Sequence, residues 1–102
     1  MAETLGICVT TRNCFKHLFE ISKAAQRADK KVEIFFTGEG VHLSQHPDFN
    51  KLMDFGSLAI CEVSFIAQQY EKEKIIGLKD KDFVTQARNA EMVEECTRYL
   101  VL

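Results

Sequence analysis

Cysteine is the residue type in this sequence whose placement points most directly to chemistry. The four cysteines stand at positions 8, 14, 61 and 96, and neither a CxxC pair nor a Cys/His finger spacing joins them. Cysteines so few and so widely spaced do not make a disulfide scaffold, which indicates reduced thiols in a cytosolic protein. A thiol is a nucleophile in its deprotonated form, so the candidate chemistry is thiolate attack and depends on the surroundings of each sulfur.

Histidine offers two further kinds of chemistry. His42 and His46 stand four residues apart and could ligate a metal together with Cys61. A metal site needs three or four converging ligands, however, and Pro47 argues against one continuous helical face, so we predict no metal site. His42 is also a candidate to activate the Cys61 thiol, although spacing alone does not bring the two within hydrogen-bond reach.

Two glycines, Gly38 and Gly40, follow an apolar run, as the glycines of a nucleotide-binding loop do. The segment matches neither GxGxxG nor a P-loop, and Glu39 between the glycines would repel a phosphate. We therefore interpret the segment as a turn and predict no cofactor.

Length and composition limit the class of protein. A chain of 102 residues, 46% hydrophobic and 27% charged, is typical of one soluble domain with an ordinary hydrophobic core. The formal net charge of -2 lacks the basic excess that binding to a phosphate backbone requires, so we expect no direct nucleic-acid partner. No stretch reaches the ~20 apolar residues that span a bilayer, and the N-terminus does not resemble a signal peptide. We expect a cytoplasmic protein without a membrane partner.

Along the chain, short apolar runs typical of buried strands alternate with segments whose apolar residues have helical spacing. Short runs rich in β-branched and aromatic residues predict four buried strands, over residues 4–11, 31–37, 57–61 and 98–102. Helical spacing between them predicts helices over 13–28, from Pro47 to Gly56, over 63–72, and after a cap at Thr85. Thr11 or Asn13 is the predicted cap of the first helix, and Gly56 suits the left-handed position just past the second. This alternation predicts an α/β fold: a single small three-layer domain over residues 1–102, with a mainly parallel four- or five-stranded sheet, flavodoxin- or Rossmann-like.

In such a fold the four cysteines are expected at different places relative to the carboxyl edge of the sheet. Cys61 ends the third predicted strand and Cys14 opens the helix after the first, so both should lie near the carboxyl edge, where these folds place their functional crevice. Cys8 and Cys96 are predicted to be packing residues. A thiol facing a helix N-terminus is stabilised as an anion, and Cys61 fits that description best. Arg12, in the loop after the first strand, could add positive charge.

Each of these assignments has a structural alternative. Free cysteine is among the most buried residue types, so Cys61, which follows two apolar residues, could be a small core residue. Cys14 shares the apolar stripe of its helix with Leu18 and Ile21. An arginine at a loop position such as Arg12 is more often simply solvated.

Three segments carry a resemblance to a known family. They are IFFTGEGV at 34–41, LAICEVS at 58–64 and RYLVL at 98–102. They resemble the DsrE/DsrF/TusD family of small sulfur-relay proteins, and with the order of the elements the resemblance covers nearly the whole chain, as one DsrE-like domain. In that family the sulfur-carrying cysteine ends the third strand, followed by two variable positions and a small residue. Cys61, three residues before Ser64, falls on that position.

The resemblance implies an intracellular sulfur-relay protein. Cys61 would accept a sulfane sulfur as a persulfide and pass it to a partner thiol, which makes the chain a sulfurtransferase-like transfer protein if Cys61 is reactive. The implied partners are sulfur donor and acceptor proteins, and the implied assembly is a homo- or hetero-oligomer, a trimer or a hexamer. Cys14, Arg12 and His42 are secondary candidates that would shape the crevice.

Two departures from the family pattern keep alternatives open. The helix after Cys61 lacks the Arg-Gly or similar pair that commonly ends it and continues as Gln68-Gln69-Tyr70, and the following loop lacks the usual Gly- and Pro-containing stretch. One alternative is a non-catalytic homo-oligomeric scaffold, or a small-ligand or partner-binding module, in which Cys61 is inert. Another is a redox pair of Cys14 and Cys61. A carrier requires an exposed and acidic Cys61 thiol, and a scaffold does not.

Overall fold

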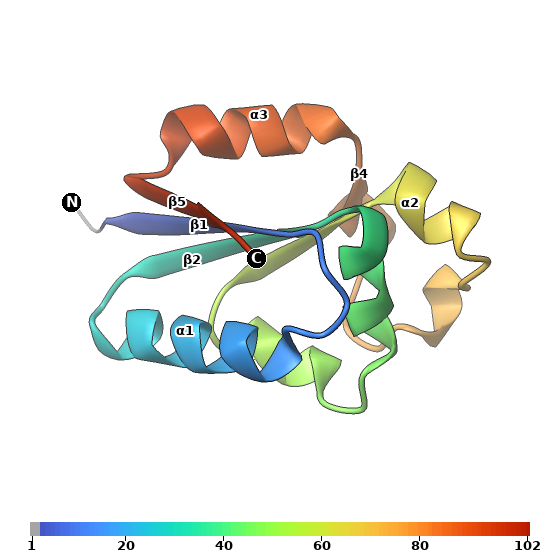
Figure 1. Cartoon of the computed structure of the whole chain (residues 1–102), viewed down its shortest axis with the longest axis horizontal. Helices are drawn as coiled ribbons and strands as arrows, with labels where there is room; N and C mark the ends of the chain where they lie inside the picture. The colour runs from blue at the N-terminus through green and yellow to red at the C-terminus, as the bar shows by residue number, and fades with distance from the viewer. Residues whose placement is uncertain (1–2) are drawn as a thin grey trace.

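A single parallel sheet of five strands organises the protein in a computed structural model that describes residues 3–102 (Figure 1). The strands lie in the order β4-β3-β2-β1-β5, and every neighbouring pair is parallel. Their bounds are β1 (Thr4–Val9), β2 (Lys31–Phe36), β3 (Ser57–Cys61), β4 (Phe83–Val84) and β5 (Arg98–Val101). The α/β fold with a mainly parallel sheet is confirmed.

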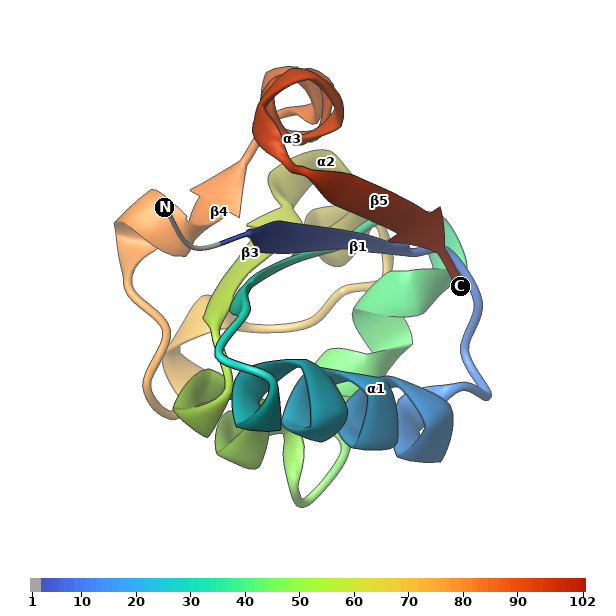
Figure 2. The same cartoon turned by 90° about the vertical axis from the view of Figure 1, so that its left-hand side faces the viewer.

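Helices cover both faces of this sheet (Figures 1 and 2). One face carries α1 (Phe15–Arg27) and the 3₁₀ helices η1 (Gly38–Gln45) and η2 (Phe49–Asp54), and the other carries α3 (Gln86–Glu95). Connections between parallel strands are right-handed, so the connections that run from β1 to β3 lie on one face and the return from β4 to β5 lies on the other. The carboxyl edge carries α2 (Glu62–Ala67), which begins where β3 ends.

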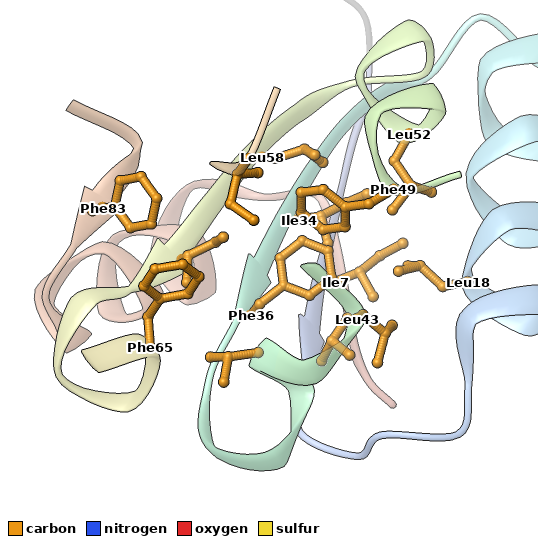
Figure 3. Close-up of a cluster of buried hydrophobic side chains, with 14 of the residues drawn as sticks. Ile7, Leu18, Ile34, Phe36, Leu43, Phe49, Leu52, Leu58, Phe65 and Phe83 are labelled. Carbon is orange, nitrogen blue, oxygen red and sulfur yellow. The ribbon is translucent and has the colours of Figure 1, made fainter. Parts of the chain in front are cut away.

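Side-chain alternation along the strands divides the core in two. The larger cluster lies between the sheet and the helices on its α1 side. Figure 3 shows its side chains converging from the strands, from Leu18 of α1 and from Phe65 of α2. The smaller cluster lies under α3 and consists of Cys8, Phe35, Ala59, Cys61 and Met92. Successive strand residues point to opposite faces, which is why Ile60 belongs to the first cluster and Cys61 to the second.

The element boundaries differ from the sequence prediction in several places. The strand predicted over 57–61 has those bounds in the structure, and Thr85 caps α3 by accepting a hydrogen bond from the Ala87 amide at 3.2 Å. The predicted helix over 63–72 is shorter, because Gln69 adopts a left-handed backbone conformation with φ of 64°. The sequence pattern does not reveal β4, because its two residues are too few to show a period. The loop predicted after β2 is the 3₁₀ helix η1.

Two further details of the prediction are wrong. The N-cap of α1 is Cys14, without a side-chain hydrogen bond, rather than Thr11 or Asn13. Gly56 is not in the left-handed conformation, which among the described glycines belongs to Gly38 and Gly77.

Close packing explains the glycine at position 56. A Cβ atom there would lie 2.2 Å from the carbonyl oxygen of Val32 in the neighbouring strand.

Within residues 3–102, no helix has the length and apolar character needed to cross a membrane.

Replacing Gly56 should therefore destabilise the sheet. We expect Gly56→Ala to lower the free energy of unfolding by about 1–3 kcal/mol, because the new methyl group overpacks a rigid strand. Urea denaturation measures this loss. Gly38→Asn is the control, because nothing lies within 4 Å of a Cβ at Gly38 and asparagine tolerates its φ of 55°. A loss for Gly56→Ala no larger than for this control would contradict the packing explanation.

Candidate functional site

Cys61 lies at the carboxyl edge of the sheet, where β3 passes into α2. It is the last residue of β3 and the N-cap of α2, and its backbone is still extended. Its side chain points to the α3 face, next to Ala59 and Met92, and the residue is 4% exposed. The structure thus confirms the predicted place of Cys61 at a strand end that leads into a helix.

Three polar residues from different elements surround the Cys61 sulfur. Ser64 (side chain and backbone), Thr37 (side chain) and Gln86 (side chain) are the hydrogen-bonding groups that favour the thiolate form of Cys61 and lower its pKa. Thr37 follows β2, Ser64 lies in the first turn of α2, and Gln86 opens α3. We call these three residues the thiol cradle. Parallel strands bring them together, since the carboxyl ends of β2, β3 and β4 meet at one edge.

Hydrogen bonds accepted by the two cradle hydroxyls leave their own protons available to the sulfur. The Gly38 amide donates to Ser64 Oγ at 3.0 Å, and Gln86 Nε2 donates to Thr37 Oγ1 at 2.7 Å. A hydroxyl has one proton and two acceptor lone pairs. Because each hydroxyl oxygen already accepts from an N–H group, its own proton is free to point to Cys61. This polarisation strengthens both hydroxyls as donors.

These contacts determine the acidity of Cys61. Burial, the largest single influence, acts to raise the pKa of the Cys61 thiol, and the hydrogen bonds from Ser64, Thr37 and Gln86 act to lower it. Together the hydrogen bonds outweigh burial, so the pKa of Cys61 lies below the ordinary value of a cysteine. The Ser64 amide, in the first turn of α2, supplies the helix-end effect expected from the sequence.

Two other cysteines show the opposite behaviour. Burial raises the pKa of Cys8, against a single hydrogen bond from Tyr99, and burial with the nearby charge of Glu33 raises the pKa of Cys96. Cys8 is buried within β1, and Cys96 ends α3 and packs under it. These positions fit the packing roles predicted for both residues. Burial thus raises the pKa of Cys8 and Cys96, whereas the pKa of Cys61 is lowered.

Cys14 lies on the other side of the sheet from Cys61. It packs against the core cluster on the α1 face, and its Sγ donates to the Thr11 carbonyl oxygen at 3.6 Å. Cys61 belongs to the cluster under α3. The structure therefore does not bring together the pair considered as a redox couple.

Arg12 and His42 meet each other and do not reach the thiol cradle. Arg12 donates to the Glu39 carboxylate at 2.8 Å, and His42 Nε2 lies 2.8 Å from the same oxygen. On the other side of its ring, His42 Nδ1 lies 2.6 Å from the Tyr70 hydroxyl. Neither Arg12 nor His42 is among the hydrogen-bond partners of Cys61. The structure thus gives these two secondary candidates a shared cluster of their own.

Two members of the thiol cradle, Thr37 and Gln86, are not singled out by the sequence pattern. The pattern places Thr37 at the end of a strand and indicates no role for Gln86. A usable signal was present, because polar residues at the carboxyl ends of neighbouring parallel strands converge. Thr37 follows β2, and Gln86 stands two residues after β4, the strand that the pattern did not reveal.

Within residues 3–102 no group of three or more His, Cys, Asp or Glu side chains is arranged to hold a metal ion. Comparison of the sequence with protein-family models finds no matching family, and a search of curated proteins finds no match. The fold and the site together define a parallel α/β protein with a hydrogen-bonded, acidic cysteine at the carboxyl edge of its sheet.

Removing a donor from the cradle should weaken the acidity of Cys61. We expect Ser64→Ala and Thr37→Val each to move the midpoint of thiolate formation to higher pH, because each loses a hydrogen bond to the charged sulfur. The pH dependence of iodoacetamide alkylation at Cys61, followed by peptide mass spectrometry, measures the midpoint. Ser57→Ala, at the opposite end of β3, is the matched control and should leave the midpoint in place. Equal midpoints for all variants would contradict the role of the cradle.

Proposed function

We propose that this protein is a sulfur carrier that accepts sulfane sulfur on Cys61 and passes it to a partner thiol. The observation that carries the proposal is the thiol cradle, which lowers the pKa of a cysteine at the edge where folds of this class do their chemistry. A structural core cysteine needs no such donors and has a raised pKa, as Cys8 does. The resemblance of the segment around Cys61 to sulfur-relay proteins supports the same conclusion.

The chemistry consists of two displacements. The Cys61 thiolate attacks the outer sulfur of a donor persulfide, a new S–S bond forms at Cys61, and the donor leaves as a thiolate. In the second step an acceptor thiolate attacks the outer sulfur of the Cys61 persulfide, and Cys61 leaves as a thiolate. No external oxidant or reductant is consumed. The cradle assists both steps, since it favours the attacking thiolate in the first and the leaving thiolate in the second.

The wider setting belongs to the same proposal. We propose donor and acceptor proteins as partners, a cytoplasmic location, and an oligomer of three or six chains, all on the resemblance to sulfur-relay proteins. Val63 and Ile66 of α2 support a protein partner, because these apolar side chains are exposed within five residues of Cys61.

One observation favours a second candidate function. Cys61 is 4% exposed, whereas direct transfer requires a reachable sulfur. The alternative is therefore a scaffold or binding module of the same fold, in which the buried thiol is structural. The two functions differ in whether Cys61 takes up sulfur.

Uptake of sulfur can be measured directly. After incubation with glutathione persulfide we expect intact-mass spectrometry to show an added mass of ~32 Da, one sulfur atom on a thiolate. A reductant should remove it, and Cys61→Ser should lack it. Cys14→Ser is the control, because Cys14 lies on the other face of the sheet, and it should retain the adduct. An adduct that persists in Cys61→Ser, or no adduct in the unmodified protein, would reject the carrier function and favour the scaffold function.

A further inference from the structure

The Cys61 sulfur is buried in this structure, so a reacting molecule cannot reach it without a conformational change. Cys61 is 4% exposed, and the polar residues around its sulfur come from three elements. We infer that one of these elements has to move before a second sulfur can approach. Thr37 directly follows β2, which is hydrogen-bonded to strands on both sides. Gln86 belongs to α3, which is held to the sheet by buried Met92 and by the ion pair between Arg88 and Glu33.

The element with the weakest hold is α2. Of its six residues only Phe65 is buried, while Val63 is 77% and Ile66 57% exposed. Short segments with few buried contacts are the ones that open locally at low cost in free energy. Because Ser64 lies in its first turn, movement of α2 would uncover the Cys61 sulfur and leave the rest of the sheet intact.

One hydrogen bond ties the far end of α2 to the body of the protein. After Ala67 the left-handed residue Gln69 turns the chain, so that Tyr70 comes back toward η1. The Tyr70 ring lies 5.7 Å from the Phe65 ring, centroid to centroid, and its hydroxyl lies 2.6 Å from His42 Nδ1. A non-glycine residue with positive φ has a conformational cost, which the contacts of Tyr70 must offset.

The partner of Tyr70 is itself held in place. His42 Nε2 lies 2.8 Å from the Glu39 carboxylate, to which Arg12 donates at 2.8 Å. The imidazole is thus fixed on both sides of its ring. A second restraint on α2 is the ion pair of Glu62 with Lys72, whose side chains are half-buried, and ion pairs that remain in contact with water contribute little to stability.

We propose that the hydrogen bond between Tyr70 and His42 is a latch that holds α2 closed over Cys61 and regulates access to the sulfur. Tyr70 and His42 are positioning residues, and Glu39 with Arg12 keeps the imidazole oriented. This inference rests on the proposed function, because a latch over Cys61 is useful to a carrier that must both protect a persulfide and release it. The latch also explains how Cys61 is acidic and covered in the same structure.

The test is the rate at which Cys61 is alkylated. If Cys61 reacts only when α2 opens, the alkylation rate reached at high pH is proportional to the fraction of molecules in which α2 is open. The midpoint of the pH profile then reports the pKa of the Cys61 thiol in the closed state. Tyr70→Phe removes the hydroxyl and keeps the ring on Phe65. We expect it to raise the limiting rate by roughly three- to tenfold, the factor that corresponds to one net hydrogen bond, with the midpoint unchanged.

Two controls separate a latch from general loss of stability. Cys8 is 3% exposed, as buried as Cys61, and lies within β1, so its alkylation rate should stay constant in Tyr70→Phe. Tyr99→Phe, which removes the other tyrosine hydroxyl of the chain, should leave the Cys61 rate unchanged. His42→Gln should match Tyr70→Phe, and the double variant should add little, because both remove the same bond.

The outcomes distinguish the latch from the carrier function. An unchanged limiting rate in Tyr70→Phe, or an equal increase at Cys8, would overturn the latch whatever the persulfide assay shows. Faster alkylation confined to Cys61, in a protein that takes up no sulfur from glutathione persulfide, would keep the latch and reject the carrier.

Discussion

The parallel direction of the strands is the constraint on which the site depends. It brings the carboxyl ends of β2, β3 and β4 to one edge, so residues far apart in the sequence, at positions 37 and 86, converge on the thiol at position 61. It also fixes the layers. Because right-handed connections advance across the sheet on one face and return on the other, α3 reaches the carboxyl edge from the side opposite to α1. The N-terminus of α3 thereby becomes one wall of the site.

At this edge two opposing effects act on one atom. Removing a sulfur from water disfavours its anion, and hydrogen bonds from fixed donors favour it. At Cys8 the first effect prevails, and at Cys61 the second. The difference follows from position. Cys8 sits inside β1, where strand backbones supply few free donors, whereas Cys61 sits where a strand ends and the polar groups of two helix starts are near.

Much of this architecture could be predicted from the sequence, because burial on both faces leaves an apolar pattern. The run at 57–61 gave the bounds of β3, and the helical spacing after residue 13 indicated α1. The pattern could not reveal β4, since two residues have no period, nor the early end of α2, since it depends on the backbone conformation of Gln69. The cradle shows the same limit. Cys61 and Ser64 share a local motif, but Thr37 and Gln86 join them through tertiary structure alone.

The sheet also isolates Cys61 from the other thiols of its own chain. Cys14 lies on the opposite face, and Cys96 lies at the far end of α3, next to Gly6 of β1. Cys8 shares the face of Cys61 but lies two strands away, beyond β2, a lateral separation of about 9–10 Å. A disulfide requires Cα atoms within ~7 Å, and in the described structure none of the other three cysteines is placed next to Cys61. Whatever bond the Cys61 sulfur forms is left for another molecule to break.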